Sequence, residues 1–148
     1  CLSNIFTMKK AYFALMGVFI LLASCAKDEW DNRNPYLPEL AVNVPINTSL
    51  PTYNKLQYAG NAVYIGGYGI NGILVINTGT GFRAYEATCA NHGVSSCSKL
   101  TLNGVEASCS CSDALVYNLF LGLANGEAQY PLKEYRVSEN GGMLTVYN

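Results

Sequence analysis

Two cysteine-rich segments decide the interpretation of this chain: CANHGVSSC at residues 89–97 and CSCSD at residues 109–113. They contain four of the six cysteines and the only histidine, His92. Cysteine and histidine are the residues that ligate iron–sulfur clusters or zinc, and cysteines also pair as disulfides. The function of the chain therefore has to be sought first in these two segments.

The residues that precede the first segment predict short β-strands. Residues 62–65 and 73–76 are β-branched runs joined by a glycine-rich loop, a pattern typical of a hairpin. Residues 40–44 alternate in hydropathy, and Pro45 predicts that this strand ends there or lies at a sheet edge. Residues 82–88 are predicted to form a strand that leads into the first segment.

The C-terminal half continues this pattern. Asn103-Gly104 is a strong hairpin signal within residues 100–108. Residues 115–121 are predicted to form a strand or one buried turn, and residues 135–147 a terminal hairpin. Beyond the N-terminal apolar run, no segment shows a sustained helical period. The sequence therefore predicts an all-β fold of short strands and frequent turns.

Composition and charge bear on the class of partner and on the number of domains. From Cys25 onward the chain carries seven Lys or Arg and ten Asp or Glu, so its formal net charge is −3. There is no basic patch, and nucleic acid is therefore not a predicted partner. The same part of the chain is long enough for one domain with a buried core. Tyrosine is frequent, and most tyrosines are predicted to pack on the sheets.

The N-terminus predicts export. MKK at residues 8–10 and the apolar run at residues 11–23 have the order of a secretory signal, and the run is too short for a stable membrane-spanning helix. LASC at residues 22–25 resembles a bacterial lipobox. The resemblance implies that residues 1–24 are removed and that Cys25 is diacylated. A simple signal peptide and an uncleaved anchor are the alternatives.

The segment after the lipobox is predicted to be a tether. Residues 25–39 comprise the lipidated cysteine and a flexible tether, and residues 40–148 form the domain. AKDE at residues 26–29 resembles the surface-export signal of Bacteroidetes lipoproteins, but a solvated charged tether has the same composition. Together these features predict a lipid-anchored protein of the bacterial cell envelope, at the outer membrane, on its periplasmic or its surface-exposed face. An oxidising compartment of this kind favours disulfides.

The two cysteine segments resemble the Rieske family, whose two boxes read C-x-H and C-x-x-H and hold a [2Fe–2S] cluster through two Cys and two His. In this resemblance Cys89 and Cys109 match the ligand cysteines, and Cys97 and Cys111 match a disulfide pair. The similarity continues downstream through Gly122, Gly126 and PLKEYRV at residues 131–137, and it spans roughly residues 82–148. It implies a fold of small antiparallel sheets with two cysteine-bearing loops that meet at one end.

The segments also depart from the family pattern. Two residues separate Cys89 from His92, where the family has one. Ser112 stands at the second histidine position, and a serine hydroxyl is a poor ligand for iron. Asp113 offers a carboxylate, which is a hard and unusual ligand for such a centre. Because the sequence has one histidine, a standard two-histidine cluster cannot form within one chain.

Three interpretations of the cysteines follow. In the first, Cys97 pairs with Cys111 and Cys89 with Cys109 as two disulfides. In the second, an altered [2Fe–2S] cluster uses Cys89, His92, Cys109 and Cys111. In the third, zinc occupies a Cys/His site, although the spacing is not that of a zinc finger.

These observations predict an envelope lipoprotein whose Rieske-like domain has lost its cluster ligands and acts as a disulfide-stapled binding or structural module. No cofactor and no catalytic residue are predicted. The alternative is an electron-transfer protein with a non-standard [2Fe–2S] cluster, the one redox activity that the resemblance implies. The predicted partners are the membrane, through the acylated Cys25, and an envelope protein or redox partner.

Overall fold

The computed structural model of this 148-residue chain describes residues 33–148. The predicted export signal, Cys25 and residues 26–32 of the predicted tether lie outside the described residues. Within residues 33–148, no helix is long and apolar enough to cross a bilayer.

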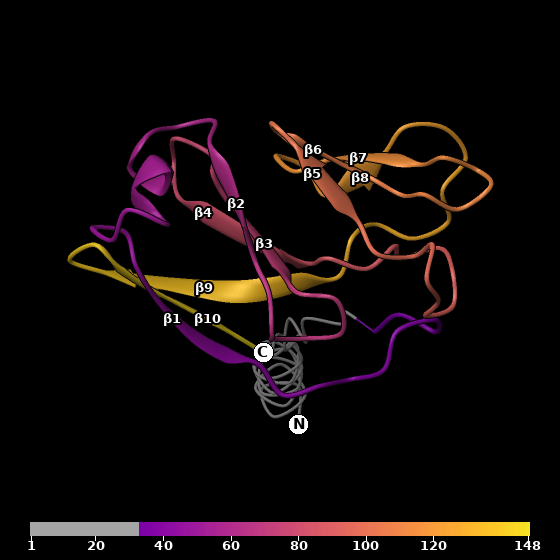
Figure 1. Ribbon diagram of the computed structural model, residues 1–148, viewed down its shortest axis with the longest axis horizontal. Helices are drawn as coiled ribbons and strands as arrows, with labels where there is room; N and C mark the ends of the chain where they lie inside the picture. Colours follow the sequence, from indigo (N-terminus) through magenta and orange to yellow (C-terminus); the bar gives the residue numbers. More distant parts are fainter. Residues whose placement is uncertain (1–32) are drawn as a thin grey trace, which may run out of the picture. The chain divides into compact units, whose positions relative to one another are not determined.

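The described residues form strands and one short 3-10 helix, η1 (Asn54–Gln57) (Figure 1). The strands are β1 (Asn43–Asn47), β2 (Ala62–Ile65), β3 (Ile73–Asn77), β4 (Phe82–Glu86), β5 (Thr101–Asn103), β6 (Glu106–Ser108), β7 (Val116–Asn118), β8 (Leu123–Ala124), β9 (Glu134–Asn140) and β10 (Met143–Tyr147). The prediction of an all-β fold is therefore confirmed.

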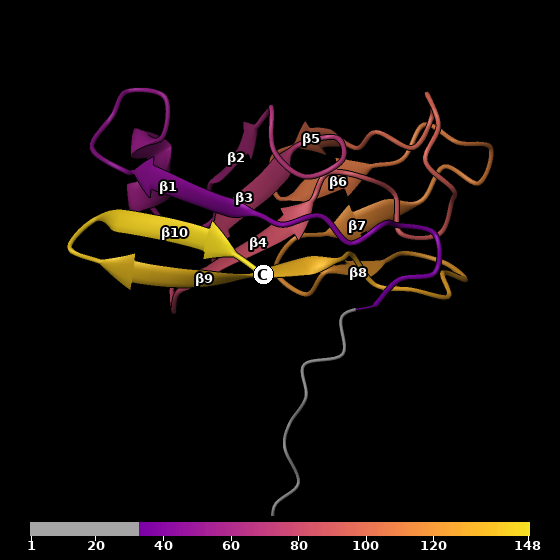
Figure 2. The ribbon, with the colours of Figure 1, turned by 90° about the horizontal axis from the view of Figure 1, so that it is seen from below.

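The larger sheet has six antiparallel strands in the order β1-β10-β9-β4-β3-β2 (Figure 2). Ala62 lies opposite Ile76, which confirms the predicted hairpin of β2 and β3. Pro45 pairs with Thr145 inside β1, and β1 is an edge strand. Of the two predicted positions for this proline, the edge is the correct one, because an edge strand tolerates a residue without an N–H.

The smaller sheet has four antiparallel strands in the order β5-β6-β7-β8. Asn103 pairs with Glu106, so the β5–β6 connection turns over two residues. Gly104 has a φ of +62° in this turn, a left-handed conformation that glycine adopts without a Cβ penalty. β7 lies in the N-terminal half of the predicted segment 115–121. β8 was not predicted, because two residues are too few for a periodic pattern.

The hydrophobic core has two clusters, and β3 contributes to both. Ile73 and Val75 belong to the cluster inside the larger sheet, which also contains Ile46, Leu144 and Val146. Leu74 and Ile76 point to the opposite face and belong to the cluster that includes residues of both sheets. These four residues, Ile73 to Ile76, are fully buried. The second cluster, which contains Cys89, Cys109, Leu115, Tyr117 and Leu119, connects the two sheets behind the cysteine loops.

Contacts to the domain begin before residue 40, within the predicted tether. Leu37 is 4% exposed, and Asn34 Nδ2 donates to the Ala90 carbonyl at 2.8 Å. Glu39 Oε1 lies 2.6 Å from Nζ of Lys133, whose side chain is 2% exposed. The described end of the predicted tether, residues 34–39, therefore packs on the domain.

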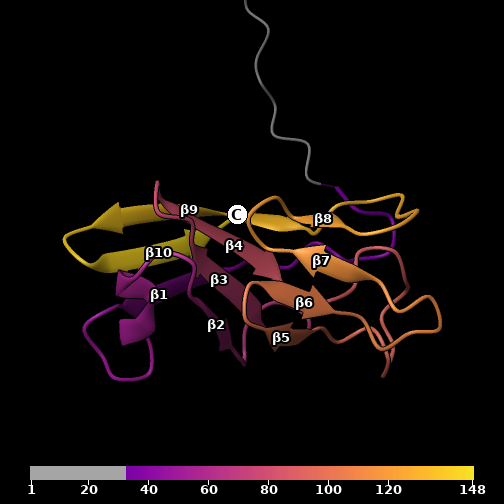
Figure 3. The same ribbon diagram turned by 90° about the horizontal axis from the view of Figure 1, so that it is seen from above.

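Both cysteine segments lie at one end of the domain. The connection from β4 to β5 carries the first segment, and the connection from β6 to β7 carries the second. Figures 1, 2 and 3 all place these connections at the end away from the β9–β10 turn. Two antiparallel sheets with cysteine-bearing loops meeting at one end are consistent with the predicted Rieske-like fold.

Candidate functional site

Backbone hydrogen bonds close both cysteine loops at their bases. In the first loop, Cys89 N donates to the Ser98 carbonyl at 2.7 Å. In the second loop, Cys109 N donates to the Leu115 carbonyl at 2.8 Å. Each base cysteine is therefore positioned by the adjoining sheet, and the residues beyond it form the tip of the loop.

A disulfide joins the two loops. Cys97 and Cys111 have an S–S distance of 2.04 Å and a Cα–Cα distance of 4.9 Å. This is the pair that the Rieske resemblance implies. The bond excludes Cys111 from the predicted set of metal ligands, because its sulfur is already bonded to Cys97.

Cys89 and Cys109 differ from the predicted second disulfide, because both are free thiols. They are 0% and 4% exposed. Cys89 Sγ lies 3.3 Å from the hydroxyl of Tyr117. Burial, together with a hydrogen bond to Cys89, raises the pKa of Cys109 to about 12. Hydrogen bonds thus take the place of the covalent bond between these sulfurs, and at neutral pH Cys109 is a protonated, weakly nucleophilic thiol.

His92 is bound by the second loop. Its Nε2 lies 2.7 Å from Asp113 Oδ2, and the two side chains are 28% and 39% exposed. Asp113, which the sequence offers as an unusual metal ligand, contacts the histidine instead. A carboxylate on one imidazole nitrogen fixes the orientation of the ring and leaves the other nitrogen for a further partner.

Three side chains bring donor atoms together at the centre of the loops. One donor atom from each of Cys89, His92 and Cys109 lies within 4.8 Å of the other two. A zinc ion with such ligands needs donor separations of roughly 3.5–4 Å, so a small contraction would bring them into range. Among residues 33–148 this group has no fourth cysteine, histidine or carboxylate. The set therefore does not fit a standard Rieske cluster, which needs a second histidine, but it fits a three-ligand metal site with an open position.

Asn91 organises the site, although no sequence pattern marks it as a site residue. Its Oδ1 accepts the backbone N–H groups of Gln129 and Tyr130 at 2.8 and 2.9 Å. Its Nδ2 donates to the Tyr130 carbonyl at 2.8 Å and to the Tyr117 hydroxyl at 2.9 Å. Asn91 thus joins the first loop to residues 129–130. Its position inside the CANHGVSSC segment was the sole signal in the sequence.

Most tyrosines were predicted to pack on the sheets, and the Tyr117 ring is fully buried in β7. Its hydroxyl also contacts Cys89 Sγ and Asn91 Nδ2, which the strand pattern did not predict. Burial is the largest cause that raises the pKa of Tyr117, and the hydrogen bond with Cys89 adds to it. The hydroxyl therefore stays protonated beside the thiol.

No protein-family model matches the chain, and no curated protein matches it. Among solved structures, the chain is similar to one in a complex of reduced oxygenase and oxidized ferredoxin in carbazole 1,9a-dioxygenase. The identity is 22%, the TM-score is 0.46, and the match covers 74% of this chain and 94% of that chain.

Proposed function

We propose that this chain is a cell-envelope lipoprotein whose Rieske-like domain acts as a disulfide-stapled binding or structural module rather than as a standard Rieske electron carrier. The observation that carries the proposal is the Cys97–Cys111 bond between two loops that supply one histidine. Ser112 stands where the family has its second histidine. A domain of this kind keeps the loop geometry and lacks the ligand set of the standard cluster.

The staple supports a binding role because it holds the loop backbones together while their tips face solvent. Residues 93–96 are exposed, and Val94 is 50% exposed. A loop fixed at both ends loses little conformational entropy when a partner binds its tip. The exposed tip of the first loop is therefore the surface at which an envelope partner would bind.

The thiol count and the visible spectrum of one sample test this function. The full chain is exported to an oxidising compartment, purified in detergent, and assayed for thiols under denaturing, non-reducing conditions. A count of two thiols or of none supports the stapled module, provided that the sample does not absorb beyond the aromatic band. Visible absorbance from iron–sulfur charge transfer, with acid-labile iron, would overturn it.

Membrane attachment through Cys25 is a separate part of the proposal. Cys25 lies outside the described residues, and the support is the LASC sequence at residues 22–25. We expect the wild-type chain to incorporate a labelled fatty acid and to fractionate with membranes. Cys25→Ser should lose both properties, and a Cys25→Ser chain that still carries the acyl label would contradict the anchor.

A second candidate function is favoured by the donor atoms of Cys89, His92 and Cys109, which lie within 4.8 Å of one another. These residues would hold a metal ion or an altered cluster, and Asp113 would orient His92. Such a centre would supply electron transfer or a Lewis acid. Metal analysis after anaerobic purification tests it: a stoichiometric metal in the wild type that is lost in His92→Ala would favour this function over the first.

A further inference from the structure

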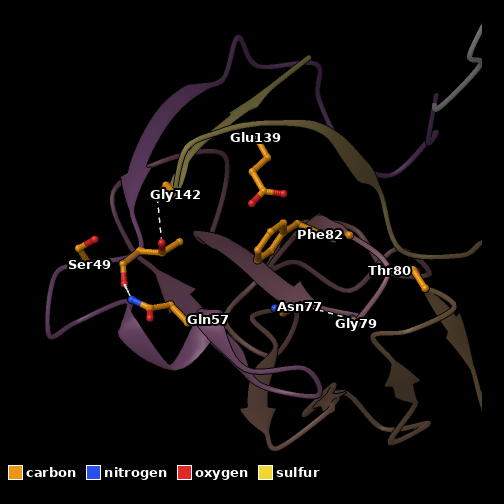
Figure 4. A pocket seen from close by; sticks show the side chains of 10 residues that line it. Ser49, Gln57, Asn77, Gly79, Thr80, Phe82, Glu139 and Gly142 are labelled. Atoms are coloured by element: carbon orange, nitrogen blue, oxygen red, sulfur yellow. Dashed lines mark hydrogen bonds between the residues drawn. The ribbon is translucent and has the colours of Figure 1, made fainter.

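A polar groove lies at the end of the larger sheet that is remote from the cysteine loops (Figures 1 and 4). Its volume is 610 Å³, within the range of roughly 300–1,000 Å³ that is typical of small-molecule sites. Three segments line it: the region from Thr48 to η1, the turn between β3 and β4, and the β9–β10 hairpin. None of these residues belongs to the cysteine site.

Three side chains of the lining each use a hydrogen-bond donor inside the protein. Gln57 Nε2 donates to the Thr48 carbonyl at 2.8 Å, and Asn77 Nδ2 donates to the Leu56 carbonyl at 2.7 Å. The Thr48 hydroxyl donates to the Gly142 carbonyl at 2.8 Å. These bonds fix the orientation of the three side chains, and each amide keeps one further N–H.

The lining of the groove also offers hydrogen-bond acceptors and one negative charge. Among the lining residues Glu139 is the one charged side chain, and the amide oxygen of Gln57 is a further acceptor. Figure 4 shows the Glu139 carboxylate directed from β9 toward the ring of Phe82, with Gln57 on the side of η1. A carboxylate beside a half-buried aromatic ring is a pair that attracts a cation, through charge and through the π face of the ring.

We propose that this groove binds a primary ammonium or guanidinium group, carried by a free amine or by a Lys or Arg side chain. The N–H groups of such a cation would bond Glu139 and Gln57, and its apolar stem would pack on Phe82. A neutral sugar fits less well, because it has no charge to pair with the Glu139 carboxylate. The inference goes beyond the proposed function, because the groove is a second binding surface, remote from the loop tip.

Amide chemical-shift mapping and calorimetric titration of the full chain in nonionic detergent test the proposal. The probes are n-butylammonium, N-acetyl-lysine methylamide and N-acetyl-arginine methylamide, with N-acetyl-norleucine methylamide and maltose as neutral comparisons. We expect the cations to shift amides in residues 48–57, 77–82 and 139–142, and to bind more weakly as salt rises. If only the two peptide-like cations bind, the natural ligand is a Lys or Arg side chain of a polypeptide. If n-butylammonium binds as well, a free amine is sufficient.

Glu139→Gln removes the charge and keeps the size of an exposed side chain. We expect it to weaken cation binding by about two- to fivefold. Glu106→Gln, a matched change of an exposed carboxylate on β6, should leave binding unchanged. Equal binding of the neutral probes, or no effect of Glu139→Gln, would overturn the proposal. An iron–sulfur spectrum would overturn the proposed function but not this inference, because the titration measures cation binding at the groove independently of the cysteine site.

Discussion

His92 Nε2 lies 2.7 Å from Asp113 Oδ2, so the single histidine of the first loop is held by the second loop. Both side chains are partly exposed, and an ion pair of this kind contributes little to stability. Its effect is on the orientation of the imidazole. The covalent link between the two loops is the Cys97–Cys111 bond, while Asn91 ties the first loop to residues 129–130.

Removal of the disulfide should destabilise the domain. For Cys97→Ala/Cys111→Ala we expect the free energy of unfolding to fall by about 3 kcal/mol, within a range of about 2–5 kcal/mol, because the bond closes a short loop of sequence separation 14. Urea unfolding without reductant measures the change. The wild-type protein treated with reductant should match the double variant. Unchanged stability in the double variant would contradict the staple.

The two remaining cysteines should be unreactive until the domain unfolds. Cys89 is fully buried, and Cys109 is 4% exposed with a raised pKa. We expect an aromatic disulfide reagent to find no fast-reacting thiol in the native protein and two thiols in urea. No thiols in urea would show that Cys89 and Cys109 pair in the exported protein. A fast native reaction would contradict their burial.

Asn91→Ala should loosen the connection between the first loop and residues 129–130. The change removes the acceptor of two backbone N–H groups, and we expect a loss of about 2–3 kcal/mol. Hydrogen exchange at the amides of Gln129 and Tyr130 should quicken in the same variant. Ser96→Ala, a change at an exposed position of the same loop, is the control and should alter neither quantity.

Local pattern was enough to predict most of the strands. The β-branched runs of β2 and β3 and the Asn103-Gly104 turn carry their structure within a few residues, and the structure contains both hairpins. The burial of both faces of β3 also follows from its unbroken apolar run. The meeting of the two cysteine loops, by contrast, was implied by the family resemblance and not by any local pattern.

The contacts of the site could not be predicted in the same way. Asn91 bonds residues 38 and 39 positions away, and no periodicity encodes such a distance. The burial of Glu86 could not be predicted either, because a charged residue in a strand usually faces solvent, whereas this side chain is fully buried. The polar groove was missed because its lining comes from three turns that share no sequence motif.

Buried acids with raised pKa values should make the domain sensitive to alkali. Burial is the largest cause that raises the pKa of Cys109 from 9.0 and of Tyr85 from 10.0. As pH rises, the unfolded chain therefore loses these protons before the folded domain does. The contribution of the two groups to stability is complete below about pH 9 and is lost as pH rises through their pKa values in the folded domain. Urea unfolding at neutral pH and above pH 9 should show this decline, and a stability that is flat or rises would contradict it.

Tyr85→Phe isolates one of these groups. Among the described residues the Tyr85 hydroxyl is the one buried side-chain polar atom without a hydrogen-bond partner. Its removal should therefore leave stability at neutral pH unchanged or slightly higher, since no bond is lost and an unpaired polar group is removed. The same variant should lose less stability than the wild type in alkali. A marked loss at neutral pH would show that the hydroxyl has a partner in solution.

The Glu86 carboxylate ties the loop between β2 and β3 to the core. It is fully buried, and its two oxygens accept four hydrogen bonds, from the backbone N–H groups of Ile70 and Asn71 and from the hydroxyls of Thr88 and Tyr135. A buried carboxylate is retained only where such bonds replace its hydration. The close packing around it leaves no room for a side chain on Gly69.

Gly69→Ala should therefore cost more than Gly67→Ala. Both glycines have a positive φ, +63° and +85°, so alanine at either position costs roughly 1–2 kcal/mol of backbone strain. A Cβ on Gly69 would also collide with Glu86 Oε2, whereas nothing lies within 4 Å of a Cβ on Gly67. The collision should add about 1–3 kcal/mol to the loss in Gly69→Ala. Urea unfolding of the two variants measures the difference, and equal losses would mean that the Glu86 carboxylate moves aside at no cost.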